Sequence, residues 1–177
     1  MHYAAWNGHV EVVKSLLNGN SKVEEVRDAR GRTALHRAAA NGWVEVVKML
    51  VNGNINATDY RNRTPLNIAS ELGHANVVQA LLEAGADATI SDIEGLSAMM
   101  YAAIAGQNAV IAVLASANVN VNERRNDGIT PLHWAVQSGF VQTVRLLLEL
   151  HADTKGGEGM EITPLDIARL CGLEEIV

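Results

Sequence analysis

A six-residue phrase recurs through the chain at a nearly constant interval. Its fullest copy reads Thr-Pro-Leu-His-Trp-Ala over residues 130–135, and residues 1–4 match the end of a further copy. Related copies begin at Thr33, Thr64, Ser97 and Thr163, which gives intervals of 31, 33, 33 and 33 residues. A repeat of this length predicts a solenoid, in which each unit buries its apolar face only against its neighbours.

Each part of the phrase suits the start of a helix. Thr is a favoured N-cap, and Pro fits the first helical position. Leu and Ala stand on one helix face, and the small Ala lets a neighbouring repeat approach closely. A Gly follows about ten residues after each Thr or Ser, where it predicts the end of a short helix. A second apolar run with helical spacing comes next, as in residues 141–148. A polar stretch such as Asp28–Gly31 then predicts a β-turn.

The six-residue phrase, the glycine that follows it and the repeat length of about 33 residues together resemble the ankyrin-repeat proteins. The resemblance covers nearly all of the 177 residues. The resemblance implies an all-α solenoid of stacked antiparallel helix pairs, with β-turn fingers projecting sideways to form a concave groove. We expect one domain over residues 1–177, with about four full repeats and two partial terminal ones. The first phrase and the last helix pair are incomplete, so we expect the chain to be a fragment of a longer one.

The composition and motifs give no support to catalysis. The sequence holds no Ser/His/Asp order or carboxylate pair that stands out from the repeats. The glycine-rich segment 155–159 lacks the Gly-Lys-Thr/Ser ending of a phosphate loop. We therefore expect no enzymatic activity and no cofactor. No apolar run approaches the ~20 residues that cross a bilayer, so we expect no membrane insertion. Cys171 is the single cysteine and predicts an intracellular location, in the cytoplasm, the nucleus or both.

The histidines and tryptophans have structural explanations. His36 and His133 belong to the phrase, whereas His9 and His74 follow the glycines, so they recur one repeat apart and do not converge on one metal ion. We expect no metal site. Trp134 occupies a slot of the phrase that leans toward the core. For Trp6, partner contact and simple exposure at the first repeat both remain open.

Charge is unevenly distributed along the chain. Residues 1–66 hold nine Lys or Arg against six Asp or Glu, whereas residues 67–177 hold five against fourteen. Arg30 and Arg32 fall in one finger, and Arg61 and Arg63 fall in the next. This asymmetry predicts a charged partner, while the net charge of −6 argues against nucleic acid.

The resemblance implies a non-catalytic module that binds a segment of another protein in the concave groove. In such proteins the contacts come from the fingers and the inner helix ends. The corresponding positions here are Arg30, Arg32, Asn41, Tyr60, Arg61, Arg63, Glu71, Leu72, Ile93, Glu94, Leu96, Ile104, Asn126, Asp127, Ile129 and Gln137. The arginines predict a partner that is acidic or phosphorylated at one end. Four apolar positions predict that its other end is hydrophobic, namely Leu72, Ile93, Leu96 and Ile104.

Two other functions remain open, together with one modification. The chain could be the targeting module of a larger enzyme or effector whose catalytic domain lies outside this sequence, or a structural spacer. Asn122 has a spacing from Leu114 similar to that of ankyrin asparagines hydroxylated by an asparaginyl hydroxylase. Its alternative role is to bond its own turn.

Overall fold

The computed structural model describes residues 1–19, 26–154, 163 and 166. Within these residues the secondary structure is helical, with turns and loops and no strand. Ten helices are defined: α1 (His2–Trp6), α2 (Val10–Gly19), α3 (Ala34–Ala40), α4 (Val44–Leu50), α5 (Pro65–Glu71), α6 (Ala75–Glu83), α7 (Ala98–Ile104), α8 (Asn108–Ser116), α9 (Pro131–Gln137) and α10 (Val141–Glu149). The predicted all-α solenoid is confirmed.

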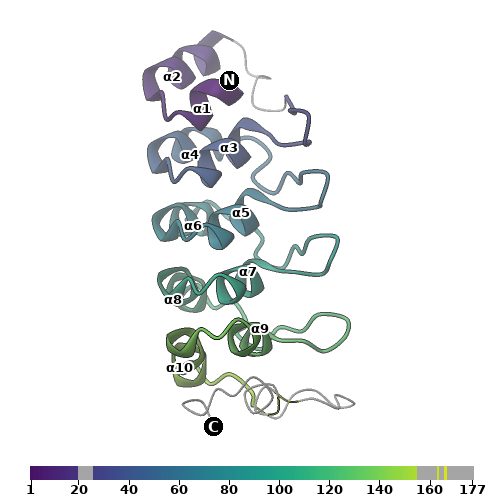
Figure 1. The fold of residues 1–177 in the computed structure, drawn as a ribbon. Coiled ribbons are helices and arrows are strands. Elements are labelled where there is room, and N and C mark those ends of the chain that lie inside the picture. Colours follow the sequence, from purple (N-terminus) through teal and green to yellow (C-terminus); the bar gives the residue numbers. More distant parts are fainter. Residues whose placement is uncertain (20–25, 155–162, 164–165, 167–177) are drawn as a thin grey trace.

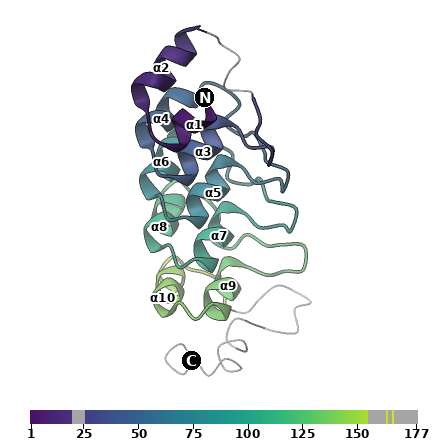
Figure 2. The same cartoon turned by 45° about the horizontal axis from the view of Figure 1, so that its top comes forward.

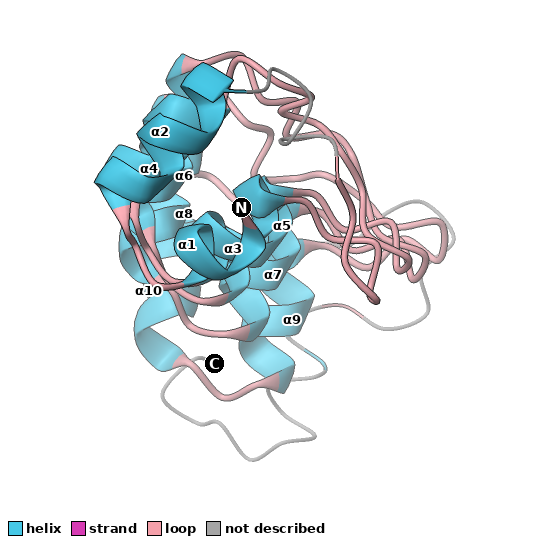
Figure 3. Ribbon diagram, turned by 90° about the horizontal axis from the view of Figure 1, so that it is seen from above, coloured by secondary structure: helices cyan, strands magenta, loops and turns pink. Residues whose placement is uncertain are grey.

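The helices form two parallel columns with a row of loops on one side (Figure 1). The inner column holds α1, α3, α5, α7 and α9, each packed on the next, and the outer column holds the even-numbered helices. Figure 2 shows the same stacking from a tilted view. Seen from above, the loops between repeats project together away from the outer column (Figure 3). These loops are the fingers, and they extend sideways from the inner column.

The inner helices begin and pack as the phrase predicts. Thr64 caps α5: its hydroxyl accepts the Asn67 amide N–H at 3.1 Å, and the Asn67 side chain accepts the Thr64 amide N–H at 2.8 Å. The last residue of the phrase is fully buried at Ala38, Ala69, Ala102 and Ala135, and the equivalent Ala4 of α1 is 5% exposed. A methyl side chain at this position lets adjacent helices meet closely, which builds one continuous core.

The turn between the paired helices of one repeat is covered by a side chain of the next repeat. Gly42 has a φ of +75°, and a Cβ there would lie 2.8 Å from the His74 ring. The ring therefore covers this turn, and its Nε2 bonds the Ala40 carbonyl at 3.1 Å. Trp43 covers the turn at Gly8 in the same way and donates to the Trp6 carbonyl at 2.8 Å. Gln107 covers the turn at Gly73 and donates to the Glu71 carbonyl at 3.3 Å. His74, read from sequence as a structural histidine, is thus a link between repeats.

A polar side chain of α3 and of α5 forms a bridge to the following finger. In α3 the His36 Nδ1 accepts the Thr33 amide N–H at 3.1 Å, which leaves Nε2 to donate to the Arg63 carbonyl at 3.0 Å. Burial lowers the pKa of His36 to about 4, so the ring stays neutral at physiological pH. Asn67 makes the equivalent bond to the Ile90 carbonyl at 3.2 Å.

The fourth repeat replaces this bridge with a buried carboxyl group. Met100 stands at the His36 position and has no side-chain donor for the next finger. Glu123, which precedes that finger, instead bonds the Ser97 hydroxyl at the start of α7. Burial raises the pKa of Glu123 to about 7, although the Met100 backbone N–H opposes this effect. The carboxyl is therefore partly protonated at neutral pH.

We expect Glu123→Gln to stabilise the protein at high pH. A carboxyl whose pKa rises on folding, here from 4.5 to about 7, binds more protons in the folded state between these values. The free energy of unfolding contributed by Glu123 therefore falls as pH rises through this window. Above pH ~7 the variant should exceed wild type by roughly 1–2 kcal/mol, and the gap should narrow toward pH ~4.5. Urea denaturation of both proteins across this pH range measures the difference in the free energy of unfolding, with Glu149→Gln at an exposed position of α10 as the control. A gap independent of pH would contradict the assignment.

Asp residues hold the fingers in shape, and Asp59 also ties the second finger to the first. The Asp59 carboxylate accepts the backbone N–H groups of Arg61 and Arg63 at 2.9 and 3.0 Å. Its side chain is 2% exposed and also pairs with the Arg63 and Arg32 guanidinium groups at 3.1 and 3.4 Å. Burial disfavours its ionisation, but the two N–H groups and Arg63 outweigh this, so the pKa of Asp59 is lowered. Asp28 and Asp92 close their own fingers in the same way.

Arg63 and Arg61 should therefore differ in their contribution to stability. Arg63→Ala leaves the buried Asp59 carboxylate short of a partner and also removes the pair with Glu71 at 3.5 Å. We expect a loss of about 1–3 kcal/mol in the free energy of unfolding. Arg61 pairs with Glu94 where both side chains are about half exposed, and Arg61→Ala should cost at most about 0.5 kcal/mol. Equal losses in chemical denaturation would show that the Asp59 pair is not the difference.

Candidate functional site

The most exposed apolar side chains at the fingers lie at two adjacent tips. Tyr60 is 73% exposed and Ile93 is 66% exposed. The Arg61–Glu94 ion pair spans the same two fingers. We call these four residues the tip patch. Leu72, at the end of α5, adds a further apolar side chain with 48% exposure. Exposed apolar side chains held close together are typical of interaction sites.

The backbone holds the tip patch in place. The Tyr60 N–H donates to the Arg30 carbonyl at 3.1 Å, and the Ile93 N–H donates to the Arg61 carbonyl at 3.0 Å. The Tyr60 ring also lies against Gly31, where a Cβ would come within 2.6 Å of ring carbon Cδ1. Because the tips are ordered before any partner arrives, little conformational entropy is lost on binding.

The four predicted arginines do not form a cationic end of the groove. Arg32 and Arg63 turn inward to the buried Asp59, and Arg61 is paired with Glu94. Among the four, Arg30 is exposed and forms no salt bridge in the described part of the chain. The prediction that four guanidinium groups line one end of the groove is wrong, because Asp59 pairs with Arg32 and Arg63, and Glu94 pairs with Arg61.

Leu96 is a core residue rather than a groove contact. It is 8% exposed and packs with Met100 and Tyr101, and the half-buried Ile104 and Trp134 lie against this cluster. The Tyr101 hydroxyl donates to Asp92 at 2.6 Å, which fixes the cluster beneath the third finger. Our expectation that the core does not require Leu96 is therefore wrong, and Ile104 offers only part of its side chain. Trp134 packs as the sequence indicated.

The remaining predicted contact residues lie before, between and after the residues of the tip patch along the chain. Asn41 is half-buried and donates to the Arg37 carbonyl at 3.0 Å, while Glu71 pairs with Arg63. Asn126, Asp127 and Gln137 are exposed, and Ile129 is half-buried. Beyond the tip patch, the exposed members of this set are therefore polar, and the apolar Ile129 is only partly accessible.

Trp6 forms a contact that the sequence did not reveal. The Arg37 guanidinium lies 5.2 Å from the centre of its ring, and Arg37 also pairs with Asp28 of the first described finger. A cation over an aromatic face is attracted to it. Trp6 keeps 43% exposure and stays a candidate contact residue.

Asn122 joins two repeats. Its side chain accepts the Asp153 amide N–H at 2.7 Å and donates to the His151 carbonyl at 3.2 Å. The sequence offered as an alternative that the Asn122 side chain bonds its own turn, but in the structure it bonds residues of the next finger instead. Asn56 accepts the Asp87 amide N–H at 2.9 Å in the same manner. Hydroxylation of Asn122 stays a prediction.

Two kinds of site are absent from the residues that the structure describes. No group of three or more His, Cys, Asp or Glu side chains gathers there in a way that could hold a metal ion. None of the described helices is long and apolar enough to cross a membrane. Cys171 and the glycine-rich segment 155–159 lie outside the described residues.

Comparison with known proteins relates the chain to several repeat proteins. It is 36% identical over 155 residues to an E3 ubiquitin-protein ligase of Arabidopsis thaliana, which covers 86% of this chain and 29% of the relative. It is 33% identical over 122 residues to a putative ankyrin repeat protein of fowlpox virus, covering 66% of this chain and 36% of the relative. A probable E3 ubiquitin-protein ligase of rice is 38% identical over 86 residues, covering 48% and 16%. The chain thus spans little more than a third, or less, of these relatives.

The family comparison covers most of the chain. The profile described as ankyrin repeats in three copies matches residues 1–92 and 87–158. These are the segments in which the capped inner helices, the glycine turns and the Asp-closed fingers recur. The chain therefore belongs to the ankyrin-repeat family.

Proposed function

We propose that this chain is a non-catalytic binding module that holds a segment of a partner protein along its fingers and inner helices. Ankyrin repeats generally mediate protein–protein interaction. The observation that carries the proposal is the tip patch, where Tyr60 and Ile93 are exposed on fingers joined by backbone hydrogen bonds. A spacer has no need of ordered, exposed apolar side chains at adjacent tips.

The partner segment is apolar where it meets Tyr60, Ile93 and Leu72. Its other end is acidic or phosphorylated and lies toward Arg30, since this guanidinium is exposed. Arg is suited to carboxylates and phosphates because its planar fork makes two hydrogen bonds at once. The apolar end supplies more of the affinity, and the charged end directs orientation and encounter. An intracellular location belongs to this proposal and is supported by the lone Cys171.

A second candidate function is the targeting module of a larger enzyme. Two of the relatives are named E3 ubiquitin-protein ligases, and the chain corresponds to 29% and 16% of their lengths. A catalytic domain encoded in the same reading frame would favour this function. It uses the same surface, because targeting also requires that the module bind a protein.

Removal of the apolar tips should weaken partner binding. We expect Tyr60→Ser combined with Ile93→Ser to reduce affinity at least about tenfold, since exposed aromatic and aliphatic anchors commonly contribute ~1–2 kcal/mol each. The partner is first identified by affinity capture and mass spectrometry, and its dissociation constant is then measured by calorimetry. Leu148→Ser, an exposed apolar position on α10, is the matched control. Unchanged affinity in a folded double variant would reject the tip patch as the site.

The charged end has its own test. Arg30→Glu should weaken binding several-fold at low salt and less at high salt, because exposed charges are screened. Arg145→Glu on α10 makes the same change of charge away from the fingers. If both variants weaken binding equally, the effect reflects net charge, and the partner has no acidic end at Arg30.

A further inference from the structure

One outer helix differs from the others in the column. At the position that faces solvent, α2, α4, α6 and α10 carry Lys14, Lys48, Gln79 and Arg145, all exposed. The equivalent residue of α8 is Ala112, which is also exposed. The sequence of α8 is Asn-Ala-Val-Ile-Ala-Val-Leu-Ala-Ser and contains no charged residue. Its outward surface is therefore small and apolar where its neighbours are polar.

This surface forms one wall of a groove between α6 and α8. The groove has a volume of about 480 Å³. Its apolar lining comes from Leu82, Ala112, Val113 and Ala117, and its polar edge from Gln79, Glu83 and Ser116. Gln79 donates to the Glu83 carboxylate at 2.9 Å, so the acidic side chain is held at the rim.

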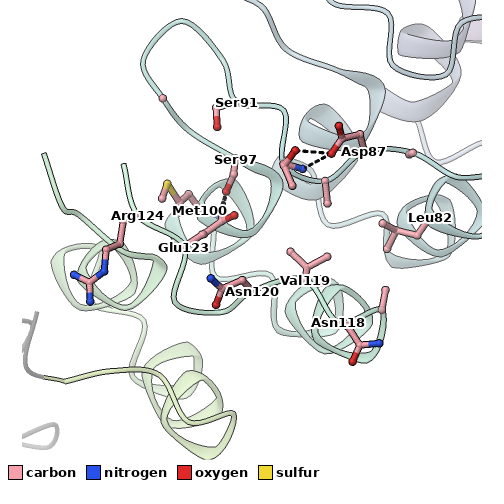
Figure 4. A pocket seen from close by; sticks show the side chains of 15 residues that line it. Leu82, Asp87, Ser91, Ser97, Met100, Asn118, Val119, Asn120, Glu123 and Arg124 are labelled. Atoms are coloured by element: carbon pink, nitrogen blue, oxygen red, sulfur yellow. Dashed lines mark hydrogen bonds between the residues drawn. The ribbon is translucent and has the colours of Figure 1, made fainter. Parts of the chain in front are cut away.

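A second cavity continues from the first. Leu82 and Ala117 line both, and the second cavity has a volume of about 620 Å³ between the loops that follow α6 and α8 (Figure 4). Asp87 contributes from one loop and Glu123 from the other, with Ser97 and Met100 of the α7 start between them. We call the two cavities together the outer groove. It includes neither Tyr60 nor Ile93 of the tip patch.

The outer groove is acidic as well as apolar. Glu83, Asp87 and Glu123 line it. Asp87 stays ionised because hydrogen bonds from the Thr89 hydroxyl and N–H lower its pKa, whereas burial raises the pKa of Glu123 to about 7, so Glu123 carries only part of a negative charge at neutral pH. Arg124 is the one cation among the described residues that line the two cavities, and it is paired with Asp153 at 3.2 Å. Neither Glu83 nor Asp87 forms an ion pair with a Lys or Arg in the described part of the chain, so their negative charge is not compensated by the protein itself.

We propose that the outer groove docks a basic amphipathic segment of a partner protein. Apolar side chains on one face of the segment fill the space between α6 and α8. Its Lys or Arg side chains reach Glu83 at the rim and Asp87 and Glu123 in the adjoining cavity. Such a helix-in-groove arrangement places the apolar anchors about one helical turn apart. The charge of this occupant is opposite to that proposed for the finger partner, so the two surfaces select different segments.

A designed peptide tests the proposal directly. The probe is a fluorescein-labelled peptide of about 18 residues, built from Leu and Lys so that Leu occupies one helical face. A second peptide carries Glu in place of each Lys. We expect the Lys peptide to bind wild type at physiological salt and the Glu peptide not to bind, as measured by fluorescence anisotropy. Ala112→Lys and Glu83→Lys should each weaken binding of the Lys peptide at least about tenfold, because each puts a like charge in its path.

Matched variants separate this site from general attraction to an acidic protein. Glu149→Lys makes the same change of charge at the α10 position equivalent to Glu83 and should leave affinity nearly unchanged. Ala112→Gln restores the polarity of the other outer helices without charge and should also weaken binding. The double Tyr60→Ser, Ile93→Ser variant should bind the Lys peptide like wild type.

Three results would overturn the proposal. Equal losses in Glu83→Lys and Glu149→Lys would mean that net charge alone attracts the peptide. Equal binding of the Lys and Glu peptides would mean that the acidic groups have no role. Dimerisation of wild type in analytical ultracentrifugation, abolished by Ala112→Lys, would show that a second copy of this chain occupies the groove instead.

Discussion

Contact between neighbouring inner helices is the interaction on which the rest of this structure depends. The alanines that end each phrase, such as Ala69 and Ala102, are fully buried because the next repeat lies directly on them. A helix pair of this length cannot bury its apolar side alone, so each repeat is stable only through its neighbours. The same stacking sets the spacing of the fingers and turns, which lets Tyr60 bond Arg30 and His74 bond Ala40 across repeats.

The departures from the repeat pattern gather in the fourth repeat. Met100 removes the polar bridge that His36 and Asn67 provide, and Glu123 takes its place as a buried carboxyl group. The outer helix of the same repeat lacks the long polar side chain found at Gln79 and Arg145. Because stacking already holds this repeat on both sides, its own side chains are free to vary without loss of the fold.

Sequence reasoning located the architecture and part of the candidate site. The N-caps, the glycine turns and the structural roles of His36 and His74 were predicted because they depend on local chemistry repeated at a fixed interval. The predictions for Leu96 and Arg63 failed for a different reason. Within one finger, Ile93 and Glu94 are exposed, whereas Asp92 before them and Leu96 two residues after them are buried. The spacing of the repeats does not predict whether a given finger side chain is exposed or buried.

The sequence by itself determined the family of fold, the start and end of most helices, and the order in which repeats stack. Those features follow from hydrogen bonding and steric preferences within a few residues of each position, together with one repeating apolar pattern. Only the tertiary structure decided which charges remain exposed, because Asp59 collects Arg32 and Arg63 from two different fingers. It likewise decided that the loops after α6 and α8 enclose a cavity with Asp87 and Glu123 on its walls. These residues are far apart in sequence, and only the packing of successive repeats brings them together.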